Sequence, residues 1–212
     1  EGECIAVLSG GRETILRLER SILNVLGQLS GIATNTAGWC QESPVPIACT
    51  RKTTWGLLDK WAVYLGGGLT HRLSKGDACM LKENDLSQEG VEQTNSIESK
   101  VSELSSDEIG AFLTIEVRNV DEVISAATAW SKRQDVRRCV IMLDNMGPEG
   151  AKEADNALRE SGLRDHVVLE GSGGIRYTGL KEWADSGVDV LSTSVLNRGV
   201  EPLDLTMLVQ GA

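Results

Sequence analysis

The alternation of short apolar runs with helical patterns is the feature that most limits how this 212-residue chain can fold. Strands of a parallel sheet that are buried on both faces are continuous apolar runs, and a crossover, usually a helix, must join one to the next. The pattern therefore predicts an α/β protein, built either as a barrel or as an open doubly wound sheet. The six predicted strands are 45–50, 78–81, 112–117, 139–143, 166–170 and 188–192.

Helical periodicity appears before the first predicted strand and between the later ones. Two helices are expected at the beginning, 12–29 and 32–39, separated near Gly31. In the first of these, apolar residues from Ile15 to Leu29 recur on one face at helical spacing. The other predicted helices are 57–65, 121–130, 149–161 and 180–185, and the polar stretch 87–107 is expected to form a helix and a loop.

Composition excludes several classes of partner. The formal net charge is −10 and no run of basic residues offsets it, so we expect no binding to nucleic acid. No apolar run is long enough to span a bilayer, and we expect no membrane partner. The five cysteines include no Cys-x-x-Cys pair, which is typical of reduced thiols in a cytoplasmic protein.

A polar group or a glycine-rich turn stands at the end of each predicted strand. Because the carboxyl ends of parallel strands open on one face of a barrel, these groups are expected to line a single active site. This convergence favours a barrel over an open sheet. The residues are Arg51, Lys52, Lys82, Glu116, Asp144, Ser172, Gly173, Gly174 and Ser194.

The residue types indicate an anionic ligand. Arg51, Lys52 and Lys82, joined by the pair His71-Arg72, would repel one another in a protected site unless carboxylates or phosphates neutralised them. The turn 172–174 is suited to a phosphate, and Glu116 and Asp144 are suited to sugar hydroxyls or Mg²⁺. Each group also has a simpler reading, since His71 could be a structural histidine and Asp144 a turn residue. Together they indicate a phosphorylated sugar and a polycarboxylate.

Six short strings contain most of these polar groups and glycines. They are Thr-Arg-Lys-Thr at 50–53, Gly-Gly-Gly-Leu-Thr-His-Arg at 66–72, Leu-Lys-Glu-Asn at 81–84, Ile-Glu-Val at 115–117, Met-Leu-Asp-Asn at 142–145 and Leu-Glu-Gly-Ser-Gly-Gly-Ile at 169–175. With the stretches 19–34, 187–190 and 203–204, they resemble, in order and over nearly the whole chain, the motifs of quinolinate phosphoribosyltransferases, also called nicotinate-nucleotide pyrophosphorylases (carboxylating).

The resemblance implies an incomplete α/β barrel of about six parallel strands preceded by helices. The barrel domain is expected at 41–200, followed by a C-terminal segment at 201–212. Residues 1–40 would be linking helices and a remnant of an N-terminal α/β sandwich domain, most of which is absent. The family also implies a homodimer or higher homo-oligomer, in which Arg20 reaches the site of a neighbouring subunit.

The implied reaction joins quinolinate to phosphoribosyl pyrophosphate and releases nicotinate mononucleotide, pyrophosphate and CO₂ for NAD biosynthesis. Residues like Arg51, His71 and Arg72 bind quinolinate carboxylates in the family. The turn 172–174 resembles the one that holds the 5-phosphate, and Ser194 lies in the final phosphate loop. The implied catalytic residues are Lys52, Lys82, Glu116 and Asp144, of which the lysines serve both substrates and the acids serve the ribose and Mg²⁺.

Three residues depart from the family pattern. Asp85 stands where a histidine is expected, Ser194 where a glycine is expected, and Trp55 where a proline is common. The first two bear on the contacts with phosphate and pyrophosphate and not on the reaction class, and they leave open a ligand-binding paralogue without catalysis. The other alternative is a nicotinate phosphoribosyltransferase that does not decarboxylate its substrate.

Overall fold

The computed structural model describes residues 2–86, 92–133 and 135–209. Its six strands form one parallel sheet in the order β1-β6-β5-β4-β3-β2, and among the described residues the two edge strands β1 and β2 do not pair with each other. The sheet is therefore an incomplete barrel, which confirms the predicted fold class. The strands are β1 (Ile47–Cys49), β2 (Cys79–Leu81), β3 (Leu113–Val117), β4 (Cys139–Asp144), β5 (Val167–Ser172) and β6 (Val190–Thr193).

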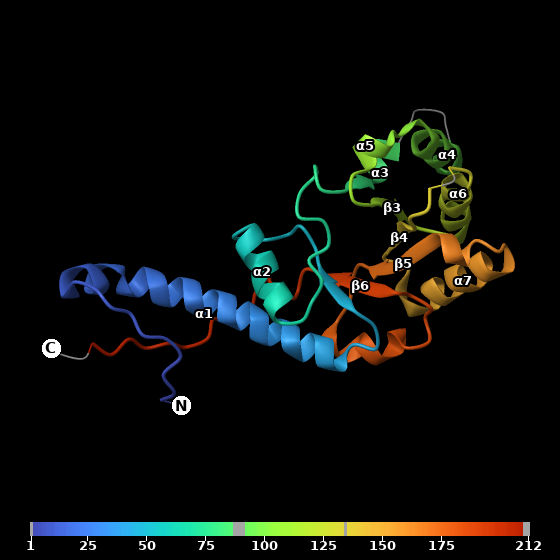
Figure 1. Ribbon diagram of the computed structural model, residues 1–212. Coiled ribbons are helices and arrows are strands. Elements are labelled where there is room, and N and C mark those ends of the chain that lie inside the picture. Colours follow the sequence, from blue (N-terminus) through green and yellow to red (C-terminus); the bar gives the residue numbers. More distant parts are fainter. Residues whose placement is uncertain (1, 87–91, 134, 210–212) are drawn as a thin grey trace.

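Helices cover the outer side of the sheet, where α6 packs against β3 and β4, α7 packs against β5, and α4 packs against α6 (Figure 1). The predicted helix at 180–185 is a 3-10 helix that begins earlier, and the part of the predicted polar stretch at 87–91 lies outside the described residues. The helices are α1 (Arg12–Glu42), α2 (Leu57–Leu65), α3 (Glu83–Leu86), α4 (Gln93–Glu103), α5 (Ser106–Ile109), α6 (Val120–Ser131) and α7 (Gly147–Glu160), with the 3-10 helices η1 (Arg164–His166) and η2 (Tyr177–Trp183).

The two faces of the sheet have different roles, which the register of the strands shows. Ile115 pairs with Ile141, which pairs with Leu169, and all three are fully buried. Side chains alternate along a strand, so the next paired positions, Glu116 and Met142, point to the other side of the sheet, the inside of the barrel. The outer face is therefore the hydrophobic core under the helices, and the inner face is free to carry polar groups.

The first helix contradicts the prediction of two separate helices, because α1 runs without a break from Arg12 to Glu42. Gly31 lies inside it at a close contact with the C-terminal segment. A Cβ at this position would lie 2.2 Å from the carbonyl oxygen of Glu201 and 3.2 Å from Cα of Pro202. The glycine that suggested a helix end therefore makes room for the segment that packs across the helix (Figure 1).

Substitution of Gly31 by alanine should lower the free energy of unfolding by about 1–3 kcal/mol, because the added methyl group overlaps backbone atoms of residues 201–202. Gly38 provides a matched control in the same helix, since a Cβ there has no neighbour within 4 Å. Gly38→Ala should be neutral or stabilising by up to about 1 kcal/mol. Urea denaturation measures the free energy of unfolding of both variants. Equal effects of the two substitutions would contradict the close contact at Gly31.

Many of the large apolar residues that recur at helical spacing on α1 and α2 are exposed in this chain. Leu18 on α1 is 44% exposed, and Trp61 on α2 is 63% exposed. On α1, burial begins only at Gly27, towards the end that meets the sheet. The buried side of α2 carries the charged residues Asp59 and Lys60, at 1% and 4% exposure, together with Ala62 and Val63. Helical spacing located both helices, although it divided α1 in two, and many of the large apolar side chains that it aligns on each helix are exposed in this chain.

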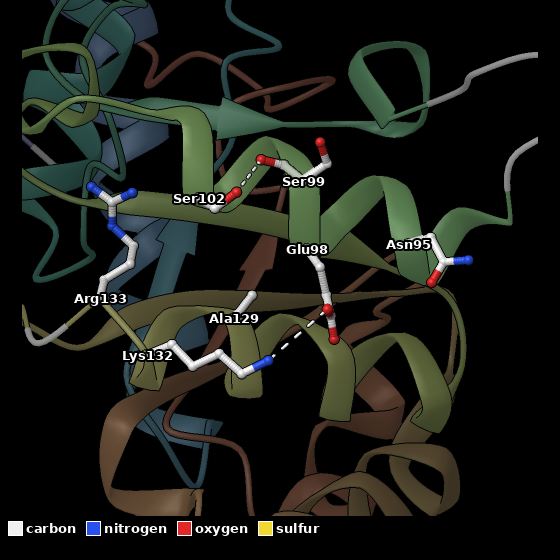
Figure 2. Close-up of a pocket in the computed structure, with 7 residues that line it drawn as sticks. All are labelled: Asn95, Glu98, Ser99, Ser102, Ala129, Lys132 and Arg133. Atoms are coloured by element: carbon white, nitrogen blue, oxygen red, sulfur yellow. Dashed lines mark hydrogen bonds and ion pairs between the residues drawn. The ribbon is translucent and has the colours of Figure 1, made fainter.

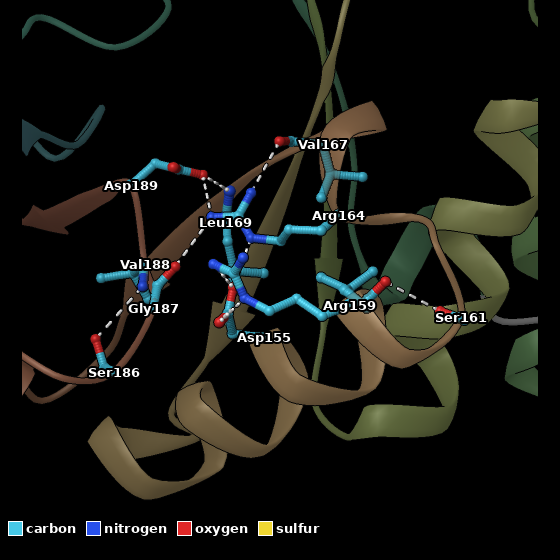
Figure 3. A network of polar contacts seen from close by, with 11 residues as sticks. Asp155, Arg159, Ser161, Arg164, Val167, Leu169, Ser186, Gly187, Val188 and Asp189 are labelled. Atoms are coloured by element: carbon cyan, nitrogen blue, oxygen red, sulfur yellow. Dashed lines mark hydrogen bonds and ion pairs between the residues drawn. The ribbon is translucent and has the colours of Figure 1, made fainter.

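A network of ionic contacts joins α7, η1 and the loop before β6 at the amino-terminal ends of the strands (Figure 3). Its centre is Arg164, whose Nε lies 2.6 Å from Oδ1 of Asp155 and whose Nη2 lies 2.9 Å from Oδ2 of Asp189. Arg164 also donates to the carbonyl oxygens of Val167 and Gly187. The side chain of Arg164 is 13% exposed and that of Asp155 is 10% exposed, so water screens this pair weakly.

Acid should weaken the fold through two carboxylates. Burial would raise the pKa of Asp155, but the hydrogen bonds and charges of Arg159 and Arg164 outweigh it and lower this pKa. Hydrogen bonds from Arg137 lower the pKa of Asp135 to about 2. A carboxyl with a lowered folded-state pKa stabilises the protein above its unfolded pKa of about 4 and loses that contribution as the pH falls through the folded value.

We therefore expect the free energy of unfolding to be steady near neutrality and to decrease from about pH 4 towards pH 2. Urea denaturation at a series of pH values measures this dependence. Asp135→Asn removes one of the two groups and should flatten the decrease. If the variant and the wild type became less stable in parallel, the assignment of the acid dependence to Asp135 would be wrong.

No helix within the described ranges combines the length and the hydropathy needed to cross a membrane. The five cysteines are all free thiols.

Candidate functional site

A cavity of about 530 Å³ opens at the carboxyl ends of the strands, on the inner side of the incomplete barrel. All six strand ends contribute to it, either directly or through the loop that follows. The lining residues are Thr50, Arg51, Lys52, His71, Arg72, Met80, Lys82, Glu116, Met142, Asp144, Asn145, Ser172, Gly173, Gly174, Ile175, Ser192, Thr193 and Ser194.

The cavity contains eleven of the twelve site residues that were predicted from the sequence. Their individual roles stay predictions, but their convergence on one cavity is a property of the fold. The twelfth, Arg20, is exposed on α1 and does not line the cavity. The residues brought together are Arg51, Lys52, His71, Arg72, Lys82, Glu116, Asp144, Ser172, Gly173, Gly174 and Ser194.

Two backbone segments bring cations to one side of the cavity. Arg51 and Lys52 follow β1, and Arg72 lies in the segment between α2 and β2. Arg72 is 7% exposed, and its Nη1 donates to the carbonyl oxygen of Ala78 at 3.1 Å. Burial, and after it the positive charge of Arg51, lowers the pKa of Arg72. The positive charge of Arg51 therefore acts on the poorly hydrated guanidinium of Arg72, and an anion between the two groups would relieve their repulsion.

His71 is held by the chain through both ring nitrogens. Its Nδ1 accepts the backbone N–H of Arg72 at 2.7 Å, so the proton of a neutral ring is on Nε2, which lies 3.1 Å from Oε2 of Glu170. The residue has a φ of 52°, a conformation that histidine adopts more readily than most residues. The imidazole thus supports its segment, and to bind a ligand it would have to exchange one of these partners.

Glu170 is a site residue that the sequence analysis missed. It is 1% exposed on β5, paired in register with Met142, and its Oε1 is buried without a hydrogen-bond partner among the described residues. The signal for it is an acidic residue inside the motif at 169–175, at a position that faces the barrel interior. The glycine-rich end of that motif, which indicates a phosphate turn, does not reveal it.

The predicted acids each lie beside a cation. Nζ of Lys82 forms an ion pair with Oε2 of Glu116 inside the cavity. Asp144 lies 3.7 Å from Nε of Arg118, which also binds Glu83 at 2.6 Å. Arg118 was not predicted, although a basic residue two positions after Glu116 was visible in the sequence. Lysines and arginines therefore outnumber carboxylates in the cavity lining by four to two.

The turn after β5 is locked against the end of β4. Gly173 has a φ of 87°, and a Cβ there would lie 2.3 Å from Oδ1 of Asn145. The N–H of Asn145 donates to the carbonyl oxygen of Ser172 at 2.9 Å, and the hydroxyl of Ser172 lies 3.2 Å from that of Ser192. Only glycine fits this approach, which explains the residue type independently of any ligand.

Two of the three residues that depart from the family pattern lie in or beside the cavity, and the third lies outside its lining. Oδ2 of Asp85 accepts the backbone N–H of Lys82 at 3.0 Å, so Asp85 organises the turn that carries the lysine. Ser194 lines the cavity after β6. Trp55 is 38% exposed before α2 and does not line the cavity.

A second cavity, of about 640 Å³, lies away from the strand ends between α4 and α6 (Figure 2). Its one ion pair within the lining joins Lys132 to Glu98 at 4.0 Å. It contains none of the predicted site residues, so the strand-end cavity is the candidate active site. The lining residues are Asn95, Glu98, Ser99, Ser102, Ala129, Lys132 and Arg133.

Protein side chains alone do not make a metal centre in the described part of the chain, where no group of three or more His, Cys, Asp or Glu residues is arranged to hold an ion. Glu116 and Asp144 remain as two oxygen donors on neighbouring strands.

Known proteins resemble this chain in sequence over nearly its whole length. The probable nicotinate-nucleotide pyrophosphorylase (carboxylating) of Methanothermobacter thermautotrophicus is 35% identical over 99% of this chain and 74% of its own length. The chloroplastic nicotinate-nucleotide pyrophosphorylase (carboxylating) of Arabidopsis thaliana is 32% identical over 95% of this chain and 60% of its own.

Crystal structures show the same fold. NadC from Streptococcus pyogenes superposes with a TM-score of 0.75 at 30% identity, and nicotinate-nucleotide pyrophosphorylase from Francisella tularensis with 0.74 at 32%. Both alignments cover 92% of this chain and 65% of the other, so the chain spans just under two thirds of those solved chains. Residues 32–208 match the family described as quinolinate phosphoribosyl transferase, C-terminal domain, and the chain belongs to that family.

Proposed function

We propose that this chain is a decarboxylating phosphoribosyltransferase that converts quinolinate and phosphoribosyl pyrophosphate into nicotinate mononucleotide, pyrophosphate and CO₂. The observation that carries the proposal is that Arg51, Lys52 and Arg72 line the same cavity as the ion pair of Lys82 and Glu116. Family membership and the names of the relatives at 30–35% identity support the same reaction.

Quinolinate fits the cationic side because it carries two carboxylates. Arg51 and Arg72 come from different segments, and each guanidinium can bind a carboxylate through two parallel hydrogen bonds. The weak hydration of Arg72 increases the strength of such a contact. Phosphoribosyl pyrophosphate adds further negative charge, for which Lys52, Lys82 and the turn 172–174 are available.

The transfer step needs positioning and charge more than covalent chemistry. The pyridine nitrogen attacks the anomeric carbon, and the bond from that carbon to the pyrophosphate oxygen breaks. Positive charge develops on the ribose ring, and the carboxylates of Glu116 and Asp144 in the cavity lining stabilise this charge. Lys82 is placed to neutralise the departing oxygen, and its ion pair with Glu116 keeps the ammonium in position.

Loss of CO₂ follows from the charge of the product ring. Once the nitrogen is ribosylated, the ring is cationic, and it accepts the electron pair left when the bond to the neighbouring carboxylate breaks. The resulting carbanion takes a proton at the same carbon. Lys52 or a water molecule supplies this proton, and Arg51 and Arg72 hold the ring while it arrives.

Magnesium is part of the proposal. Mg²⁺ prefers oxygen ligands and often binds through one or two carboxylates together with substrate phosphates. Glu116 and Asp144 are two carboxylates in the cavity lining, and the described side chains form no larger group of metal ligands. Pyrophosphate oxygens of the substrate would complete the coordination shell of the ion. The ion would neutralise the charge of the leaving pyrophosphate.

Incubation of the protein with quinolinate, phosphoribosyl pyrophosphate and Mg²⁺, followed by chromatography and mass spectrometry, tests the reaction. Nicotinate mononucleotide and an equal amount of CO₂ are the expected products. Product from nicotinate in place of quinolinate, without CO₂, would identify the non-decarboxylating alternative. Binding of both substrates in calorimetry without any product would identify a ligand-binding paralogue.

A homodimer, or a larger homo-oligomer, is the state we propose in solution. The support is the exposed apolar surface of α1 and α2, including Leu18, Val25 and Trp61, which a monomer would leave in water. Arg20 lies on the same helix as this surface, away from its own cavity, so a neighbouring subunit is the place where it could act. We also propose the division at 1–40, 41–200 and 201–212, and cytoplasmic localisation, which five free thiols support.

A further inference from the structure

Helix α2 buries two adjacent charged side chains, Asp59 and Lys60, behind the wall of the cavity. They are 1% and 4% exposed, and neither lines the cavity. Charged groups are rarely buried without partners, because the loss of hydration must be offset by hydrogen bonds or opposite charge. The partners of these two residues are therefore informative.

The ammonium group of Lys60 joins two backbone segments. Its Nζ donates to the carbonyl oxygen of Thr70 at 2.6 Å and to that of Thr50 at 3.4 Å. Thr50 immediately precedes Arg51, and Thr70 immediately precedes His71. One buried side chain thus binds the backbone directly beside both groups of cavity cations.

No backbone hydrogen bond among the described residues joins the segment that follows β1 to the segment that contains Thr70 and His71 at the position of these carbonyls. The segment before His71 pairs with β1 through two bonds, from the N–H of Cys49 to the carbonyl oxygen of Leu69 and from the N–H of Leu69 to that of Ile47. Within the described residues, this pairing ends there, before the cationic residues begin. Lys60 continues the link one residue further along both segments, where they separate to form the cavity wall.

The loop after β1 is also held from its other side. Oδ2 of Asp59 accepts the N–H of Thr54 at 2.7 Å and Nδ2 of Asn197 at 3.2 Å. The same Nδ2 donates to the carbonyl oxygen of Lys52 at 2.9 Å. Asn197 is 2% exposed, so this contact, like those of Lys60, is protected from water.

We propose that Lys60, assisted by Asp59 and Asn197, is a positioning residue that sets the spacing between Arg51-Lys52 and His71-Arg72. This inference rests on the proposed function, because that spacing decides whether two arginines can bind the two carboxylates of quinolinate together. Lys60 touches no substrate. It acts by fixing the backbone carbonyls beside the residues that do.

Replacement of Lys60 by methionine tests the proposal, since methionine fills the space but cannot donate to the carbonyls. Misplacement of binding groups by about 1 Å costs on the order of a hundredfold in rate. We expect Lys60→Met to raise the KM and the calorimetric Kd for quinolinate by on the order of tenfold to a hundredfold, with a smaller change in kcat. Lys60→Arg, which can still donate to two carbonyls, should recover most of the affinity.

Leu158→Ala is the control for reduced stability, because Leu158 is fully buried on α7 and lies outside the cavity lining. It should lower the melting temperature and leave KM unchanged. A Lys60→Met protein that is folded and has the wild-type KM and Kd would overturn the proposal. So would a Lys60→Arg protein as impaired as Lys60→Met.

If Lys60→Met does not fold, Asn197→Ala tests the proposal in its place. This substitution removes the hydrogen bond to the Lys52 carbonyl oxygen and should also raise the KM for quinolinate. An unchanged KM in a folded Asn197→Ala protein would overturn the proposal. Calorimetry with quinolinate separates this inference from the proposed reaction. Weaker binding by the variant supports positioning even where the wild type forms no product, whereas absence of product from the wild type counts against the reaction.

Discussion

Replacement of Arg51 by alanine should lower kcat/KM for quinolinate by roughly 30-fold to several thousand-fold, which corresponds to about 2–5 kcal/mol for losing a charged contact that the bound substrate covers. The fold should survive, because the Arg51 side chain is exposed in the cavity and has no hydrogen-bond partner among the described residues. Removal of this cation also leaves Arg72 without the neighbour that lowers its pKa.

Steady-state kinetics with both substrates measures the effect, and circular dichroism with thermal denaturation checks the fold. Arg138→Ala is the matched control, since Arg138 is exposed at the start of β4, opposite the cavity. It should keep the wild-type kcat/KM. Wild-type kinetics for Arg51→Ala would refute a carboxylate contact at this position.

The largest loss of stability is expected from Arg164→Met. The substitution keeps much of the side-chain volume but leaves Asp155 with a weaker partner and removes the donors to Asp189 and two backbone carbonyls. Breaking such a buried ionic contact on one side should lower the free energy of unfolding by about 3–5 kcal/mol. Because the network lies at the amino-terminal ends of the strands, kcat and KM of the folded protein should change little.

Arg159 allows a direct comparison, since it binds the same carboxylate, with Nε 2.7 Å from Oδ2 of Asp155, but its side chain is 61% exposed. Water screens that pair, so Arg159→Met should cost about 0–1 kcal/mol. Urea denaturation of both variants at neutral pH gives the two values. Similar losses would mean that burial does not govern the strength of this network.

The fold class was predictable because parallel strands buried on both faces leave a continuous apolar pattern. The predicted strands at 112–117 and 139–143 overlap β3 and β4 almost completely. Positions of helices followed from spacing, but their buried sides did not. Helical spacing places Trp61 among the apolar residues of α2, yet its side chain is exposed, whereas Asp59 and Lys60 are buried. A pattern of apolar residues shows which face avoids water and does not show whether the covering surface belongs to the same chain.

The site was predictable to the extent that the ends of parallel strands converge. Residues directly after a strand, such as Arg51 and Asp144, were identified from that rule. The supporting residues were not, because Lys60 and Glu170 act through tertiary contacts with Thr70 and His71, which no local pattern reveals. Gly31 was misread for the same reason, since the contact that requires it comes from residues 201–202.

The pairing of Leu69 with β1 has a consequence for solubility. An uncovered edge strand offers free amide and carbonyl groups to other chains and promotes aggregation. Leu69 occupies the outer edge of β1 through its bonds to Cys49 and Ile47, and the same segment continues into His71 and Arg72. Any change that detaches this segment would therefore disorder ligand recognition and, in the same event, create an open edge for intermolecular sheet growth.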